Sequence, residues 1–307
     1  MTHMLAKFTR ILVQGAVFFL PVDKKIAIDR QLRGREEFRK LQQADCVVIS
    51  FGKSGRTWLR VMLSRFYQLK HDLPENSLIG FDNLHAKNPD IPRILFTHDN
   101  YLKDFTGNAD SKKDYYRKKV VLLVRDPRDV VVSQYFQWKH RMRPWKKRLN
   151  MYPAHGADIN EYQFAMDQNA GLPKIVGFFN LWADEAGNID QLLVVRYEDM
   201  RRDTARVLGQ ILAFIGTPAS PEETQDVVDF SSMENMKKME QQRTFRLSGS
   251  RMVPGDRNNP DSYKVRRGKV GGFRDYFDED QVDSIEQLLQ QTLQPVYGYT
   301  RHEANGS

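Results

Sequence analysis

The sequence predicts an α/β protein with a three-layer α/β/α arrangement around a mostly parallel central sheet. Two observations support this fold class. Apolar runs of strand length alternate with segments of helical character: the runs cover 46–50, 93–97, 120–124 and 192–197, and the helical segments cover 57–68, 127–141, 160–185 and 203–215. Continuous apolar runs are typical of strands buried on both faces, and their alternation with helices favours a parallel sheet.

The chain is long enough to bury one large core. It has 307 residues, of which 40% are hydrophobic and 28% charged, as in ordinary globular proteins. We divide it into an apolar and basic N-terminal segment, 1–40, and a single domain, 41–300. The lone cysteine, Cys46, has no partner for an internal disulfide, which excludes a disulfide framework and favours a reducing, cytoplasmic compartment.

The net charge of +8 favours acidic partners, such as a phosphorylated nucleotide, an anionic saccharide or a membrane surface. We expect no nucleic-acid partner, because the chain has no recognisable nucleic-acid motif. We also expect no metal, because no pair of carboxylates and no cluster of His and Cys suggests a site. The oligomeric state stays open.

The N-terminal segment contains an apolar stretch, 11–20, that follows Lys7 and Arg10. Ten residues are too few to cross a bilayer as a helix. Three interpretations remain open: a helix packed on the domain, a peripheral anchor on the inner face of a membrane, or a signal peptide, although no small-residue cleavage site follows.

The first apolar run is followed by a small, basic turn and then by a helix. Gly52 and Gly55 allow a close approach of the backbone, Lys53 supplies a mobile charge, and Ser54 and Thr57 supply hydroxyls. The start of a helix leaves N–H groups unpaired, so this turn is predicted to bind an anion.

The segment 52–54 resembles the end of the nucleoside-triphosphate loop G-x-x-x-x-G-K-[ST]. The first glycine of that pattern would fall at Val47, inside the predicted strand, so the full pattern is not met. The order Lys-Ser-Gly-x-Thr-Trp at 53–58 instead resembles the loop of sulfotransferases that use 3'-phosphoadenosine 5'-phosphosulfate (PAPS). The resemblance implies that this loop holds the 5'-phosphosulfate, with Trp58 on the adenine side and Arg56 in place of a family threonine.

A second block strengthens the resemblance. Arg125 ends the apolar run 120–124, and Ser133 follows it by eight residues. Sulfotransferases of the cytosolic type have an arginine and a serine at this spacing. The resemblance implies that both side chains clamp the 3'-phosphate of the donor.

Further blocks agree with the same family. Tyr197 ends the last apolar run, where the resemblance implies an adenine contact, and Ser231 and Met233 stand where the family has a Thr-Ser-Phe segment. A basic segment near the C-terminus resembles the part that holds the 3'-phosphate from the other side; it consists of Arg266, Arg267 and Gly268.

His98 ends the strand predicted at 93–97. The family has a Lys-Thr/Ser-His motif here, in which the histidine deprotonates the acceptor hydroxyl, but Phe96 replaces the lysine. The resemblance implies that His98 is the base and that Lys53 stabilises the leaving phosphate. Arg56 is a candidate to replace the missing lysine. A hydrogen-bonded loop histidine without a catalytic role is the alternative for His98.

Together these blocks predict a P-loop-like sulfotransferase fold, of a bacterial type, that transfers the sulfuryl group of PAPS to a hydroxyl and leaves 3',5'-adenosine bisphosphate (PAP). The basic run 139–148, which includes Trp145, favours an anionic saccharide or lipid-linked acceptor over a small phenol. A solvated flank of a lid without a binding role is the alternative for this run. Two other functions stay open: a P-loop kinase or NTPase, and a non-catalytic module that binds anionic glycans or membranes.

Overall fold

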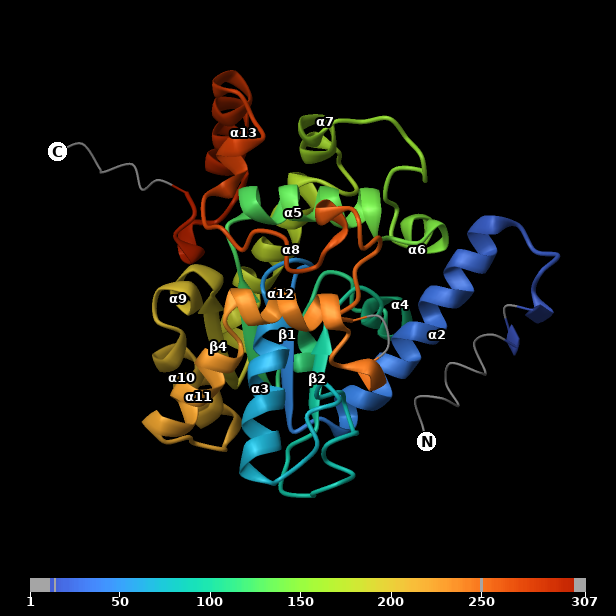
Figure 1. Ribbon diagram of the computed structural model, residues 1–307. Helices are drawn as coiled ribbons and strands as arrows, with labels where there is room; N and C mark the ends of the chain where they lie inside the picture. Colours follow the sequence, from blue (N-terminus) through green and yellow to red (C-terminus); the bar gives the residue numbers. More distant parts are fainter. Residues whose placement is uncertain (1–11, 14, 249–250, 301–307) are drawn as a thin grey trace.

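The computed structural model describes residues 12–13, 15–248 and 251–300. Its centre is a four-stranded parallel sheet with the strand order β2-β1-β3-β4 (Figure 1). The strands are β1 (Cys46–Ser50), β2 (Ile94–Thr97), β3 (Lys119–Val124) and β4 (Gln191–Arg196). All four strand positions agree with the sequence prediction to within one residue at each end.

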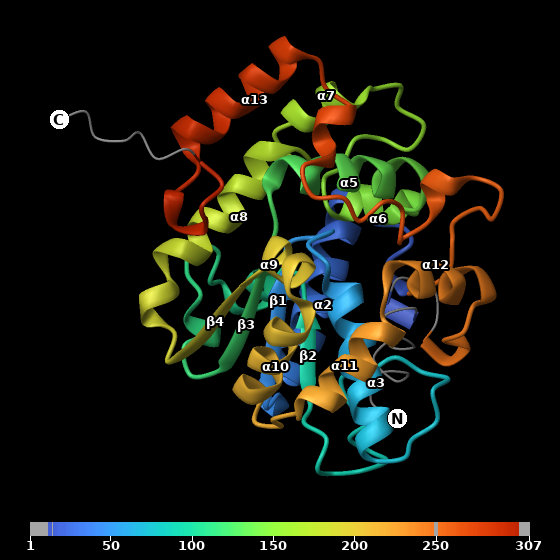
Figure 2. The same ribbon diagram turned by 60° about the vertical axis from the view of Figure 1, so that its left-hand side comes forward.

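Helices cover both faces of this sheet (Figure 2). One face packs on α2 (Val22–Gln43), α5 (Pro127–His140) and α8 (Leu172–Asp184), with α7 (Glu161–Met166) and α13 (Glu279–Thr292) outside them. The other face packs on α3 (Arg56–Lys70), α9 (Tyr197–Arg202), α10 (Thr204–Ile215), α11 (Pro221–Phe230) and α12 (Met233–Gln242). Two short helices, α4 (Leu102–Thr106) and α6 (Pro144–Leu149), complete the set described here. The predicted three-layer α/β/α fold is confirmed.

The side chains of the central strand alternate between the two layers. Val47 and Ile49 of β1 belong to the core beneath α5 and α8, whereas Val48 belongs to the core beneath α3 and α10. All three are fully buried, as expected for a strand in the middle of a parallel sheet. Because β1 pairs with both β2 and β3, the loops after these three strands leave the sheet side by side.

The single helix predicted over 160–185 is wrong, because the structure has two helices there, α7 and α8. The Asp167 side chain accepts hydrogen bonds from the N–H groups of Asn169 and Ala170 and closes a turn. Gly171 then packs against the Ala165 carbonyl so closely that a Cβ would lie 2.3 Å from that oxygen. A continuous helix could not make these contacts.

Helix α2 leans along one side of the molecule, next to α4 and α6 (Figure 1). Arg30 donates to the carbonyls of Leu149 (2.8 Å) and Asn100 (3.1 Å), and Trp145 donates to Asp29 (2.8 Å). The boundary expected at residue 40 lies inside α2, which is therefore a part of the same packed body.

The apolar stretch at 11–20 lies only partly within the described residues. Phe18 and Phe19 are 75% and 71% exposed, so this part of the stretch does not form the packed helix considered above. Among the described residues, no helix is both long and apolar enough to cross a bilayer.

Candidate active site

A cavity of about 670 Å³ opens at the carboxyl ends of the strands. Its wall includes thirteen of the residues that the sequence singled out: Lys53, Gly55, Arg56, Thr57, Trp58, His98, Arg125, Ser133, Tyr197, Met233, Arg266, Arg267 and Gly268. Ser54 and Ser231 are fully buried behind the wall. Parallel sheets place their ligand sites at this edge.

The turn between β1 and α3 takes a backbone conformation that few residues adopt. Lys53 has a φ of 74°, and Gly55, which caps α3, has a φ of 89°. A Cβ on Gly55 would lie 2.6 Å from the Tyr197 ring, so only glycine fits there. The turn thereby directs the free N–H groups at the start of α3 to the cavity, where they favour an anion.

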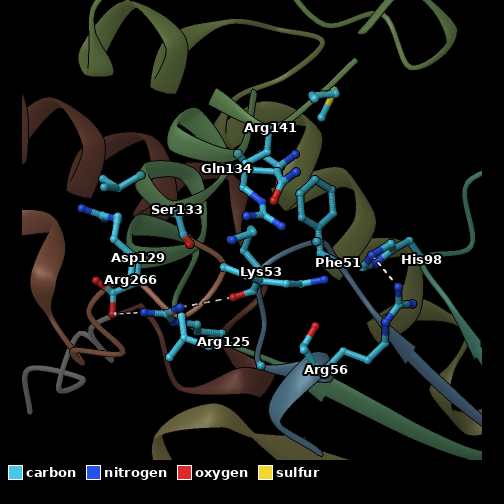
Figure 3. A pocket seen from close by; sticks show the side chains of 18 of the residues that line it. Phe51, Lys53, Arg56, His98, Arg125, Asp129, Ser133, Gln134, Arg141 and Arg266 are labelled. Atoms are coloured by element: carbon cyan, nitrogen blue, oxygen red, sulfur yellow. Dashed lines mark hydrogen bonds and ion pairs between the residues drawn. The ribbon is translucent and has the colours of Figure 1, made fainter. Parts of the chain in front are cut away.

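Arg125 ties this turn to two other segments (Figure 3). Its guanidinium donates to the Lys53 carbonyl (3.2 Å), to the Lys269 carbonyl (3.0 Å) and to the Asp129 carboxylate (3.3 Å). Asp129 also accepts from the Gly271 N–H (2.9 Å). Three segments far apart in the sequence therefore meet around one arginine, and Lys53 and Arg125 share one side of the molecule.

The aromatic part of the wall is similarly interlocked. The Tyr197 hydroxyl donates to the Gly268 carbonyl (3.3 Å), and the Trp58 indole donates to the Ser231 carbonyl (2.9 Å). A Cβ on Gly268 would lie 2.1 Å from the Met233 methyl group. Ser231 thus contributes its backbone, and its side chain does not reach the cavity.

The cavity is strongly cationic. Twelve lysine and arginine side chains line it among the described residues, against one carboxylate, that of Asp129. Burial, together with the charges of Arg141 and Arg125, lowers the pKa of Lys53 to about 7. Several of these cations pair with carboxylates behind the wall, such as Arg141 with Glu240, but the wall itself carries a large excess of positive charge and is suited to a ligand with several negative charges.

His98 is held on both ring nitrogens (Figure 3). Nδ1 lies 2.8 Å from the Ser50 carbonyl oxygen, and Nε2 lies 2.6 Å from Nη2 of Arg56. Burial and the charge of Arg56 keep the pKa of His98 well below its usual value. Behind this pair, Thr97 donates to Glu37 of α2, and burial raises the pKa of that carboxyl to about 7.

The basic run 139–148 divides between the cavity and the interior. Lys147 is buried, with its ammonium group 4.5 Å from the centre of the Trp138 ring. The members that face the cavity lie beside basic and aromatic residues from other segments; this part of the wall consists of Arg33, Arg143, Trp145, Lys146, Tyr152 and Lys174.

Two buried carboxylates hold the wall together and were not predicted from the sequence. Glu240 of α12 is fully buried and accepts hydrogen bonds from the N–H groups of Lys264 and Val265 and from Arg141. Nothing local in the sequence marks Glu240. Asp129 could have been found from the sequence, because it lies one helical turn after Arg125, at a spacing that favours an ion pair.

The comparison with protein families gives one match, to the sulfotransferase domain, over residues 43–296. The chain belongs to the sulfotransferase domain family. PAPS-dependent sulfuryl transfer is the activity of that family, so the predicted enzyme class is confirmed.

Curated relatives are distant but match most of the chain. Human sulfotransferase 2A1 is 26% identical over 274 residues, covering 84% of this chain and 87% of the relative. Cytosolic sulfotransferase 5 of Arabidopsis thaliana is 24% identical over 281 residues, covering 83% and 81%.

Solved structures show the same fold at lower identity. Mouse sulfotransferase SULT7A1, complexed with PAP, is 19% identical with a TM-score of 0.55 and coverage of 84% of this chain and 89% of that one. A retinol dehydratase in complex with retinol and PAP is 19% identical with a TM-score of 0.56 and coverage of 85% of each chain.

Proposed function

We propose that this sulfotransferase transfers the sulfuryl group of PAPS to a hydroxyl group of an acidic acceptor. The observation that carries the proposal is the position of Lys53, which lies between Arg125 and Ser133 on one side and the Arg56–His98 pair on the other (Figure 3). A donor with a phosphate group at each end fits this distribution of cations.

Each part of the wall has a role in holding the donor. The turn 53–57 would bind the 5'-phosphosulfate with its N–H groups, and Trp58, Tyr197, Met233 and the backbone at Ser231 would surround the adenine. The 3'-phosphate would lie among the residues on the other side of Lys53, which are Arg125, Ser133, Arg266, Arg267 and Gly268. This second anion site also distinguishes the donor from ATP, which has no 3'-phosphate.

The reaction requires little of the protein beyond alignment and charge neutralisation, as in phosphoryl transfer. Lys53 neutralises the charge that grows on the oxygen between sulfur and the leaving phosphate. Nε2 of His98 takes the proton of the acceptor hydroxyl as that oxygen attacks sulfur in line. The products are a sulfate ester and PAP.

The part of the wall that contains Arg143, Trp145, Tyr152 and Lys174 is the side where the acceptor would bind. It favours an acidic saccharide or an acidic lipid head group. Trp145 and Tyr152 offer aromatic faces for a sugar ring, while Arg143 and Lys174 have no carboxylate within ion-pair distance among the described residues. Burial lowers the pKa of Lys174 to about 8, and a bound anion would relieve this. The narrower resemblance to bacterial members of the family stays a prediction.

The donor is tested by thermal unfolding with PAP, with ATP and magnesium, and with buffer alone. We expect stabilisation by PAP alone, of about 2.7 kcal/mol when its concentration is 100 times the dissociation constant. Stabilisation by ATP and magnesium would support a P-loop kinase or NTPase instead. No response to any nucleotide would support a non-catalytic binding module.

The acceptor is tested by transfer of labelled sulfate from PAPS into a fractionated extract. We expect label in the fraction that an anion exchanger retains before the reaction. The variants Arg143→Ser and Lys174→Met should lose transfer but keep the response to PAP, whereas Arg148→Ser, an exposed change outside the cavity wall, should keep both. Label found in neutral steroids or phenols would overturn the acidic acceptor.

A further inference from the structure

The contact between Arg56 and His98 fixes where the protons of the imidazole lie. The Ser50 carbonyl can only accept, so the nitrogen 2.8 Å from it, Nδ1, carries a hydrogen. Nη2 of Arg56 can only donate, so Nε2 offers its lone pair at 2.6 Å. His98 is therefore neutral in the free protein, and the lone pair that would accept a proton from the acceptor is already occupied.

Arg56 itself lacks compensation for its charge. Its second terminal nitrogen, Nη1, is buried and has no hydrogen-bond partner, and no described carboxylate lies within ion-pair distance of the guanidinium. The charge of Glu37 acts on Arg56 from farther away, and that carboxyl is engaged with Thr97. A buried guanidinium in this state has a strong tendency to bind an anion.

Arg56 is also placed where the donor would present that anion. It is the first residue of α3, it follows the capping Gly55 directly, and it lines the cavity together with Lys53. The same turn directs the N–H groups at the start of α3 to the cavity, so an anion bound there lies beside the guanidinium.

We propose that Arg56 is a positioning residue that senses the donor: it occupies Nε2 of His98 in the free protein and leaves it for the sulfuryl group when PAPS binds. The inference rests on the proposed function. A hydrogen bond from a guanidinium to an anion is roughly twice as strong as one between neutral groups, so the sulfuryl oxygen competes successfully with a neutral imidazole.

Two consequences follow for the reaction. Nε2 is free to take a proton only while a sulfuryl group is in the cavity, so the donor must bind before the acceptor can react. PAP keeps the 5'-phosphate, which the N–H groups of the turn and Lys53 hold, but it has no sulfuryl group for Arg56. After transfer Arg56 therefore returns to His98, and the base is blocked again until PAP is replaced by PAPS.

The test is the ¹⁵N spectrum of the histidine side chains in the free protein, with PAP and with PAPS. The variant His98→Gln identifies the signals of His98 among those of the seven histidines, because it removes that one set. We expect the Nε2 signal of His98 to be the same in the free protein and the PAP complex and to move in the PAPS complex. An identical signal in all three states, or an equal shift with PAP, would overturn the proposal.

Two variants separate this role from a structural one. In Arg56→Thr and Arg56→Lys, the Nε2 signal of His98 should differ from that of the unmodified protein even without nucleotide, because the guanidinium contact is lost. In Arg56→Thr the pKa of His98 should also rise, because a positive charge has gone. Arg148→Thr is the matched control and should leave the spectrum unchanged. If neither PAP nor PAPS alters the melting temperature, the proposed function fails; if both do and His98 does not respond to PAPS, only this inference fails.

Discussion

Lys53 is an unusual lysine, because burial and neighbouring cations bring its pKa to about 7 in the free protein. A bound phosphate group stabilises the protonated form, so the pKa of Lys53 should rise when PAP binds. Below pH 6 the amine already carries its proton in both states. At pH 8 it is mostly neutral in the free protein, so binding should take up a proton and the affinity for PAP should fall as the pH rises above 7.

This uptake is measured by titration calorimetry at pH 8 in two buffers of different ionisation enthalpy. The difference in apparent heat gives the number of protons taken up, and Lys53→Met should reduce it. Equal heats in both buffers for the unmodified protein would contradict the prediction.

His98 gives a second prediction, on the rate of transfer. If Nε2 is the general base, His98→Gln should lower turnover by about 10² to 10⁴ while the response to PAP remains. The pKa of His98 lies well below its usual value. Protonation of His98 should therefore not change the rate of transfer above pH 6.5 and should lower it only in more acidic solution. The control is His71→Gln, outside the cavity wall. Unchanged turnover in His98→Gln would reject the role.

Motif spacing predicted which residues reach the cavity better than it predicted how they act. Lys53 and Arg125 come together because they follow β1 and β3 at the same edge of the sheet, whereas Arg266 follows no strand and was expected there from the family resemblance alone. Ser54 and Ser231 show the limit, because the direction of a side chain depends on the turn that holds it. The Arg56–His98 contact joins residues 42 positions apart and has no local signal.

Helix α12 is the element whose role the sequence did not indicate. Its Glu240 carboxylate accepts from the N–H groups of Lys264 and Val265 at 2.8 to 3.0 Å and pairs with Arg141 at 3.3 Å. The segment that continues to Arg266 is therefore fixed to α12 and α5 by one buried side chain. Hydrogen bonds to a charged group contribute about 1.5–3 kcal/mol each.

We expect Glu240→Gln to lower the free energy of unfolding by about 3 kcal/mol, because it leaves the charge of Arg141 uncompensated in a buried position. The affinity for PAP should fall as well, since Arg266 loses its support. Urea unfolding and PAP titration measure the two effects. Glu234→Gln, an exposed change on the same helix, is the control, and equal stability of both variants would contradict this role for Glu240.

The break between α7 and α8 was also beyond the sequence analysis, although its signals are local. Gly171 and Pro173 are typical of a helix start, but the apolar residues on both sides keep helical spacing and conceal the turn. The decisive contact is the close approach of Gly171 to the Ala165 carbonyl, which depends on how the two helices pack. Periodicity reports which face of a segment is buried and not whether the segment is continuous.

The position of the site in the fold followed from the class of sheet alone. Parallel strands end at one edge, so residues that follow separate strands were expected to converge there, and they do. The strand order could not be derived in the same way. The strand order depends on which strands pair. In the structure β1 lies between β2 and β3, so His98, at the end of β2, meets the end of β1 and the turn that follows it.

The apolar stretch before α2 carries the last prediction, which concerns peripheral membrane contact on the inner, cytoplasmic face. Phe18 and Phe19 are mostly exposed, and Lys7 and Arg10 precede them in the sequence, a combination that suits the surface of an anionic membrane. Burying one phenylalanine side chain contributes about 1.5–3 kcal/mol, so two exposed rings can supply most of a weak, reversible attachment.

We therefore expect the intact chain to sediment with anionic vesicles. The double variant Phe18→Ser/Phe19→Ser should bind them at least a hundredfold more weakly, because each lost ring removes about 1.4 kcal/mol of attachment or more. Deletion of residues 1–21, which leaves α2 intact, should abolish binding without altering the response to PAP. Val296→Ser, at an exposed apolar side chain near the C-terminus, is the matched control. If the deletion variant still binds vesicles, the attachment lies elsewhere on the basic surface. If neutral vesicles bind the intact chain as strongly as anionic ones, Lys7 and Arg10 have no role in the attachment.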